Sequence, residues 1–146
     1  ATLGRHYGRI RGVPVDEGVR VAVKATASKL TYQLVDGDGR DTTPVLNQAA
    51  MNALAFAMLF AQAEERAARG EPSWLVLDDP GQSLDHDGLR GLAEVVEDVA
   101  TRVPVVLATF PGTLADTLIR APSGAVLRHR LRRQADGAAK LEEVGS

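Results

Sequence analysis

The sequence places carboxylates at the end of a short apolar run. Residues 74–77 read Trp-Leu-Val-Leu, Asp78 and Asp79 follow at once, and Asp85 comes shortly after. Such a run is typical of a buried parallel strand, and open α/β sheets bind ligands at the C-terminal ends of their strands. A carboxylate there can hold Mg²⁺, largely through water, and the next carboxylate can orient or deprotonate an attacking water. We therefore predict Asp78 as the metal-side acid and Asp79 as the catalytic, water-side acid. The alternative is a strand that simply ends in a polar Asp-Asp-Pro turn.

These acids need a sheet and flanking helices to position them. Apolar residues at helical spacing and short apolar runs alternate after residue 47, which favours an α/β fold with a mostly parallel sheet flanked by helices. Before it, two strands and an Asp-Gly-Asp-Gly turn at 36–39 predict an N-terminal antiparallel hairpin. We expect residues 1–18 to be a linker or the end of an upstream element. The predicted strands are 19–24, 29–35, 74–77, 103–109 and 125–133, with a short terminal strand after a turn at 136–137, and the predicted helices are 47–69, 87–102 and 113–120.

The residues that follow the acids resemble a known motif. Asp78-Asp79-Pro80 and then Gln82-Ser83-Leu84-Asp85 are similar to the Walker B motif and D-loop of ABC-type ATPases. The closest likeness is to SMC-like and RecF/RecN-related repair ATPases. In that family the D-loop, here Ser83, Leu84 and Asp85, crosses to an opposite ATPase head.

Two flanking segments extend the resemblance over roughly residues 19–133. Residues 45–55 resemble the family's signature motif at a helix start, with Asn47 in place of serine, Gln48 following it, Ala49 in place of glycine and Ala50 in place of an acid or amide. The resemblance implies that this helix N-terminus approaches a γ-phosphate bound by a partner head.

Residues 105–110 resemble the strand that leads to the family's switch histidine. Phe110 occupies the histidine position and cannot hydrogen-bond a phosphate, so Thr109 is the nearest candidate for that role. Alternatively hydrolysis is slow. In either case we interpret Phe110 as a core aromatic.

A phosphate-binding loop is absent from this sequence. No G-x-x-x-x-G-K-[ST] motif occurs, nor any Gly-Lys pair, so the lysine and loop that cradle phosphates are missing. The resemblance therefore implies that residues 19–146 are the C-terminal lobe of a P-loop NTPase head of ABC type, with residues 1–18 as a linker or the end of an upstream coiled coil. An N-terminal lobe of the same protein would carry the Walker A loop.

The resemblance also implies a cofactor set and partners. ATP and Mg²⁺ would bind between the two lobes, ATP would drive head-to-head homodimerisation, and ATPase activity would appear only in the joined head, in DNA repair or genome maintenance. One alternative is a degenerate head that dimerises or binds DNA without useful turnover. Another is a metal-dependent nuclease or phosphotransfer domain that uses Asp78, Asp79 and Asp85.

The remaining features set bounds on location and partners. Arg128, Arg130 and Arg132 would line one face of a strand, which predicts either DNA contact or a charged, solvated edge strand. The net charge of −2 does not mark the whole chain as a nucleic-acid binder. The absence of cysteine agrees with a reducing cytoplasm, and no apolar run is long enough to span a membrane.

Overall fold

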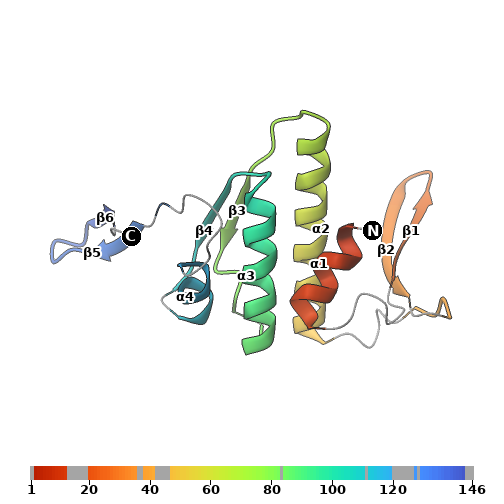
Figure 1. Ribbon diagram of the computed structural model, residues 1–146, viewed down its shortest axis with the longest axis horizontal. Helices are drawn as coiled ribbons and strands as arrows, with labels where there is room; N and C mark the ends of the chain where they lie inside the picture. Colours follow the sequence, from red (N-terminus) through yellow and green to blue (C-terminus); the bar gives the residue numbers. More distant parts are fainter. Residues whose placement is uncertain are drawn as a thin grey trace.

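The protein combines four helices with three pairs of strands in a computed structural model that describes residues 2–12, 20–35, 38–41, 47–82, 84–110, 112–119, 127 and 129–143. The pairs β1–β2 and β5–β6 are antiparallel hairpins, and β3–β4 is a parallel pair. Figure 1 shows the helices in the middle of the molecule, with the two hairpins at opposite ends of its long axis. The helices are α1 (Thr2–Arg11), α2 (Gln48–Ala68), α3 (His86–Ala100) and α4 (Thr113–Ile119), and the strands are β1 (Arg20–Thr26), β2 (Lys29–Val35), β3 (Leu75–Asp78), β4 (Val105–Ala108), β5 (His129–Arg133) and β6 (Ala139–Glu143).

The hydrophobic core lies where α1, α2 and α3 meet and extends under β3. Ile10 of α1, Phe60 of α2 and Leu92 of α3 are fully buried. Each is one member of an apolar stripe at helical spacing, and burying such stripes against one another is the main favourable term in the stability of the fold.

Helix α1 occupies the segment that we expected to be a linker or the end of an upstream coiled coil. Residues 2–11 are helical, and His6, Tyr7 and Ile10 lie against α2 and α3. Gly4 and Gly8 weaken the intrinsic helical preference of this segment, so its pattern gave no helical signal. Tertiary packing of the buried face supplies the stability that propensity lacks. Residues 13–19 lie outside the described ranges.

The predicted helix at 47–69 is confirmed as α2, because it begins and ends where the capping residues indicated. The side chain of Asn47 accepts a hydrogen bond from the Ala50 N–H at 2.9 Å. Gly70 follows the helix with a φ of 73°, a left-handed conformation that suits glycine. The predicted helices at 87–102 and 113–120 correspond to α3 and α4.

The strand pairing confirms the predicted parallel sheet only in part. Only β3 and β4 are parallel in the part of the chain that the structure describes. Strand β5 pairs with β6, in the register Leu131 opposite Leu141, instead of joining them. A short turn at 135–137 makes the antiparallel partner locally available, whereas joining the parallel pair would require an additional crossover. The N-terminal antiparallel hairpin is confirmed, but the turn between its strands lies at 27–28 and not at 36–39. Residues 36 and 37 lie outside the described residues.

Strand β3 is covered on one face only, whereas its continuous apolar pattern predicted burial on both. Leu75 and Leu77 are 4% and 3% exposed, but Trp74 and Val76 are 70% and 55% exposed. The neighbouring Val106 of β4 is 62% exposed. The helices pack on a single side of this two-stranded sheet, and its other side is an open apolar surface.

Candidate functional site at the acidic edge of β3

The two predicted acids lie at the C-terminal end of the parallel pair. Asp78 is the last residue of β3 and lies beside Ala108 of β4, and its side chain is exposed. The Asp79 N–H continues the ladder by donating to the Ala108 carbonyl oxygen at 2.7 Å. The backbone of both acids is therefore held by β4, which makes this edge a fixed point for their carboxylates.

Asp79 is held in an unusual backbone conformation. Its φ of 42° is the one positive value at a non-glycine among the described residues. Asp tolerates this region better than most residues, yet such conformations persist only where the surroundings enforce them, and they cluster at functional sites. Pro80, which follows, is buried. The chain thus turns sharply away from the sheet immediately after the second acid.

Two side chains orient the Asp79 carboxylate. Gln82 donates from Nε2 to Oδ2 at 2.8 Å, and Thr109 donates from Oγ1 to Oδ1 at 3.5 Å. Motif reasoning missed the Gln82 contact, although the residue lies in the quoted motif. Thr109 was predicted near a phosphate, and the structure places it beside the second acid. Asp79, Gln82 and Thr109 are therefore brought together at this edge.

The D-loop residues serve first as the start of α3. Asp85 is the N-cap, because its Oδ1 accepts from the Gly88 N–H at 2.8 Å, and Leu84 is half-buried against the core. The Leu84 N–H donates to the Gly81 carbonyl oxygen at 3.1 Å. Ser83 lies outside the described residues. The loop therefore has defined anchors on both sides of that position.

The signature-like segment forms the first turn of α2. Asn47 and Gln48 are exposed, Ala49 is half-buried and Ala50 is buried. The Ala50 N–H is already used by the Asn47 cap. Figure 1 shows α2 starting at the end of the molecule toward which β3 and β4 run (bottom in this view), so the helix start and the acidic edge face the same end.

The switch-like position carries an exposed aromatic ring. Phe110 is 75% exposed, two residues after the end of β4. The sequence-based interpretation of Phe110 as a core aromatic is therefore wrong for this chain, because no described element covers the ring. Phe110 and Val106 are therefore both exposed apolar side chains on the same stretch of chain.

The acids at this edge differ in how well they suit a metal ion. No group of three or more His, Cys, Asp or Glu side chains within the described ranges could hold an ion. Asp85 is committed to capping α3, which argues against a nuclease site built from Asp78, Asp79 and Asp85. One exposed carboxylate such as Asp78 fits Mg²⁺ better, because this ion keeps several waters and is commonly bound by one or two carboxylates together with substrate phosphates.

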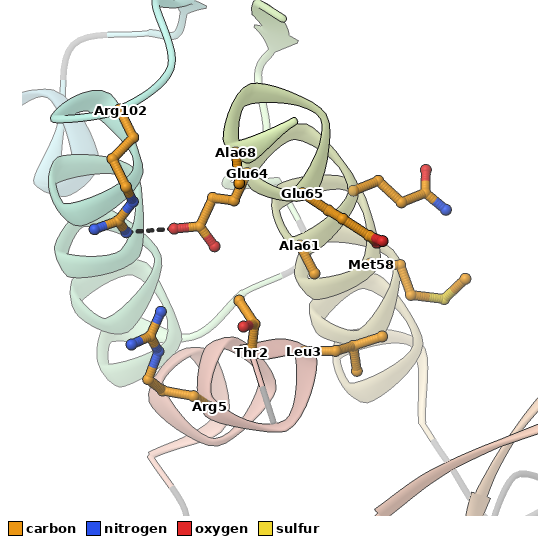
Figure 2. A pocket seen from close by; sticks show the side chains of 10 residues that line it. Thr2, Leu3, Arg5, Met58, Ala61, Glu64, Glu65, Ala68 and Arg102 are labelled. Atoms are coloured by element: carbon orange, nitrogen blue, oxygen red, sulfur yellow. Dashed lines mark hydrogen bonds and ion pairs between the residues drawn. The ribbon is translucent and has the colours of Figure 1, made fainter. Parts of the chain in front are cut away.

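A separate charge cluster joins the three core helices, away from the acidic edge. Glu64 lies between His6, whose Nε2 is 2.6 Å from its Oε2, and Arg102. Figure 2 shows Arg102 and Glu64 pointing toward each other above the first turn of α1, beside a cavity of about 600 Å³. Burial raises the pKa of Glu64, but hydrogen bonds and charges from His6 and Arg102 outweigh burial and leave the pKa lowered.

The predicted basic strand lies in the C-terminal hairpin. Arg130 and Arg132 of β5 are exposed and share one face with Glu142 and Lys140 of β6. Arg132 pairs with Glu142 at 3.6 Å. Arg128 lies outside the described residues. The face is thus basic but partly neutralised within the hairpin.

Comparisons with solved structures identify the architecture. One matched chain comes from a study of the ATP-driven dimerization and DNA-stimulated activation of SMC ATPases. Its TM-score is 0.65 and its identity 13%, and the match covers 99% of this chain and 84% of that one. The SMC head domain from Thermotoga maritima matches with a TM-score of 0.62 and 14% identity, and the match covers 99% of this chain and 46% of that one. The SmcHead bound to the C-winged helix domain of ScpA matches with a TM-score of 0.69 and 12% identity, and the match covers 98% of this chain and 41% of that one.

The chain has the fold of an SMC ATPase head. It spans under half the length of two of the matched chains. No protein-family model matches the sequence, and neither does any curated protein. The likeness to SMC heads inferred from the motifs is therefore confirmed at the level of fold. None of the helices in the described ranges is long and apolar enough to cross a membrane.

Proposed function

We propose that this chain is the C-terminal half of an SMC-like ATPase head, which completes an ATP and magnesium site when it joins a separate N-terminal lobe that carries the phosphate-binding loop. The observation that carries the proposal is the open apolar face of the β3–β4 sheet. Val76 and Val106 lie side by side on this face in the parallel register, and both are more than half exposed. A contiguous exposed apolar surface of this kind is typical of an interaction site.

The open face and the acidic edge belong to the same surface. Asp78 follows Val76 by two residues, and alternate residues of a strand point to the same side. A lobe that covers Val76 and Val106 therefore brings its own groups next to the Asp78 carboxylate. This geometry supports a site that is divided between two lobes, with the acids supplied by the present one.

Within that site the residues take distinct roles. Asp78 would hold Mg²⁺ in company with the phosphates of ATP, where the ion would neutralise phosphate charge. Asp79 would orient and polarise the attacking water, and its hydrogen bonds from Gln82 and Thr109 hold the carboxylate for this task. The starts of α2 and α3 would face the opposite head, as the likeness to SMC heads suggests.

Reconstitution with the N-terminal lobe tests the proposal. The mixture should bind ATP in a Mg²⁺-dependent manner, and Asp79→Asn should lower turnover by on the order of 10²-fold or more while ATP binding persists. Glu94→Gln is the matched control, because Glu94 is an exposed acid in the middle of α3, away from the helix start, and it should turn over at the wild-type rate. Absence of Mg²⁺-dependent ATP binding by the mixture, or unchanged hydrolysis by Asp79→Asn, would refute the proposal.

A degenerate head is the second candidate, favoured by the exposed Phe110 at the switch-like position. Its ring offers no hydrogen bond to a phosphate. In this case the assembled head would bind ATP and dimerise, yet hydrolyse ATP no faster than Asp79→Asn does. Measurable turnover by the wild-type head that depends on Asp79 would exclude this candidate.

A further inference from the structure

The C-terminal end of α1 rests directly on the first two turns of α3. A methyl group at Gly91 would lie 2.1 Å from the Arg9 carbonyl oxygen and 3.0 Å from Ile10 Cα. Backbone lies on the other side of this contact, so no side-chain rearrangement could make room. Glycine at position 91 is therefore required for α1 to approach α3 this closely.

The same contact reaches the D-loop segment through Gly88. A methyl group at Gly88 would lie 3.3 Å from Leu84 Cβ, 3.4 Å from the Ile10 carbonyl oxygen and 3.0 Å from Asp85 Oδ1. Gly88 thus lies between the end of α1 and the residues that begin α3. In addition, the C-terminal carbonyls of α1 meet the N-terminal half of α3, an arrangement that the helix dipoles favour.

Charged side chains from the middle and the last turn of α1 anchor it further to α2 and α3. Arg9 binds Asp98 at 3.2 Å and Arg5 lies 4.0 Å from the same carboxylate, while His6 binds Glu64 of α2. Helix α1 is therefore held to α2 and α3 by packing and by charge, and its C-terminal end lies against Gly88 and Gly91.

We propose that α1 positions the Leu84–Asp85 segment, and that Gly91 is a positioning residue for contact between two heads. The inference rests on the proposed function, in which this segment faces the opposite head. When α1 is displaced from Gly88 and Gly91, Leu84 and the Asp85 cap lose the surface that fixes their orientation. Docking of α1 thereby becomes a condition for a competent head-to-head interface.

Hydrogen exchange on this chain alone gives the first test. Gly91→Ala is compared with Gly4→Ala, which adds the same methyl group to α1 where nothing lies within 4 Å. In Gly91→Ala the amides of α1 and of Leu84, Gly88 and Leu89 should lose protection together, by about tenfold or more. In Gly4→Ala protection should stay level or rise by at most about fivefold. Loosening of α1 without loss of protection at 84–89, or no change at either place, would overturn the proposal.

A second variant covers the case in which Gly91→Ala does not fold. Asp98→Asn weakens the anchors from Arg5 and Arg9 without adding an atom, so it should produce the same paired loss of protection at a smaller amplitude. If Asp98→Asn loosens α1 while Leu84, Gly88 and Leu89 stay protected, the segment does not depend on α1.

The assembled head gives the second test. In Gly91→Ala the affinity of a single assembled head for ATP should stay within about twofold, while ATP-dependent dimerisation and kcat fall by about tenfold or more. A merely structural defect would lower ATP binding and dimerisation together, and that result would contradict a positioning role. A wild-type head that does not dimerise would overturn the proposed function, whereas the exchange result on the chain alone would still decide whether α1 holds the segment.

Discussion

Glu64→Gln should destabilise the protein far more than its surface charge suggests. The Glu64 side chain is 10% exposed, and its two oxygens contact His6 of α1 and Arg102 beyond α3. One carboxylate on α2 thus connects α1 to the segment that follows α3. The amide of glutamine keeps the shape but removes the charge, and its NH₂ group cannot accept from Arg102, which offers donors only.

The expected magnitude follows from the number of charged contacts and their burial. A hydrogen bond to a charged group contributes about 1.5–3 kcal/mol net, and breaking a buried ion pair costs about 3–5 kcal/mol. Because the amide oxygen retains one acceptor, we expect the free energy of unfolding to fall by about 2–4 kcal/mol. For a chain of this size a loss of about 3 kcal/mol corresponds to a decrease in Tm of about 6–12 °C.

The pH dependence gives the prediction a sign. The pKa of Glu64 in the folded state is lowered from its ordinary value of 4.5. The stability that this carboxylate contributes is therefore fully present above pH 4.5 and is lost as the pH falls through the lower, folded-state pKa. Glutamine does not titrate, so the difference in stability between wild type and Glu64→Gln should narrow as the pH falls below 4.5.

Urea denaturation followed by circular dichroism at pH 7 and in steps below pH 4.5 measures both effects. Glu65→Gln is the matched control: Glu65 is the neighbouring residue, its side chain is 66% exposed, and it pairs with the exposed Arg69. It should change stability by no more than about 0.5 kcal/mol. Equal effects of the two variants at pH 7, or a difference that widens in acid, would refute the assignment of Glu64 as the connection between the helices.

The remaining predictions concern the cap, the open face and the hairpin. Asn47→Ala should lower the free energy of unfolding by about 0.5–2 kcal/mol in thermal denaturation, because α2 loses its N-cap; an unchanged Tm would show that the cap is dispensable. Val106→Glu should weaken binding of the N-terminal lobe by about tenfold or more in calorimetry. It should change the stability of this chain by no more than about 0.5 kcal/mol, because the side chain is exposed. Undiminished binding would exclude the open face as the interface. If the β5–β6 hairpin contacts DNA, replacing Arg130 and Arg132 by Glu should lower the affinity for DNA. It should also reduce the slope of log affinity against log salt concentration by about one per lost phosphate contact. Lys29→Glu should have neither effect, and equal effects of the two changes would indicate bulk charge alone.

The local motifs predicted much of the central architecture. Asn47 indicated the start of α2 and Gly70 its end, and Asp78-Asp79 indicated the end of a strand; all three are confirmed. These signals are readable because a cap, a left-handed glycine and an apolar run each depend on a few neighbouring residues. The roles of Asp78 and Asp79 in binding magnesium and polarising water remain predictions.

Features that depend on distant residues could not be predicted in the same way. Helix α1 forms because Ile10 and His6 find partners on α2 and α3, not because residues 2–11 favour a helix. The orientation of Asp79 by Thr109 joins residues thirty positions apart.

The sequence by itself determined the acidic edge, the capped helices and the likeness to SMC-like heads, because each of these depends on residues that are close together in the chain. Only the tertiary structure decided that one face of β3 is open, since an apolar run does not state how many layers will cover it. Only the structure revealed that Gly91 admits the backbone of α1 and that Glu64 of α2 contacts both His6 and Arg102. Contacts of this kind depend on which segments meet in space, and the free energy that selects them comes from packing and burial across the whole core.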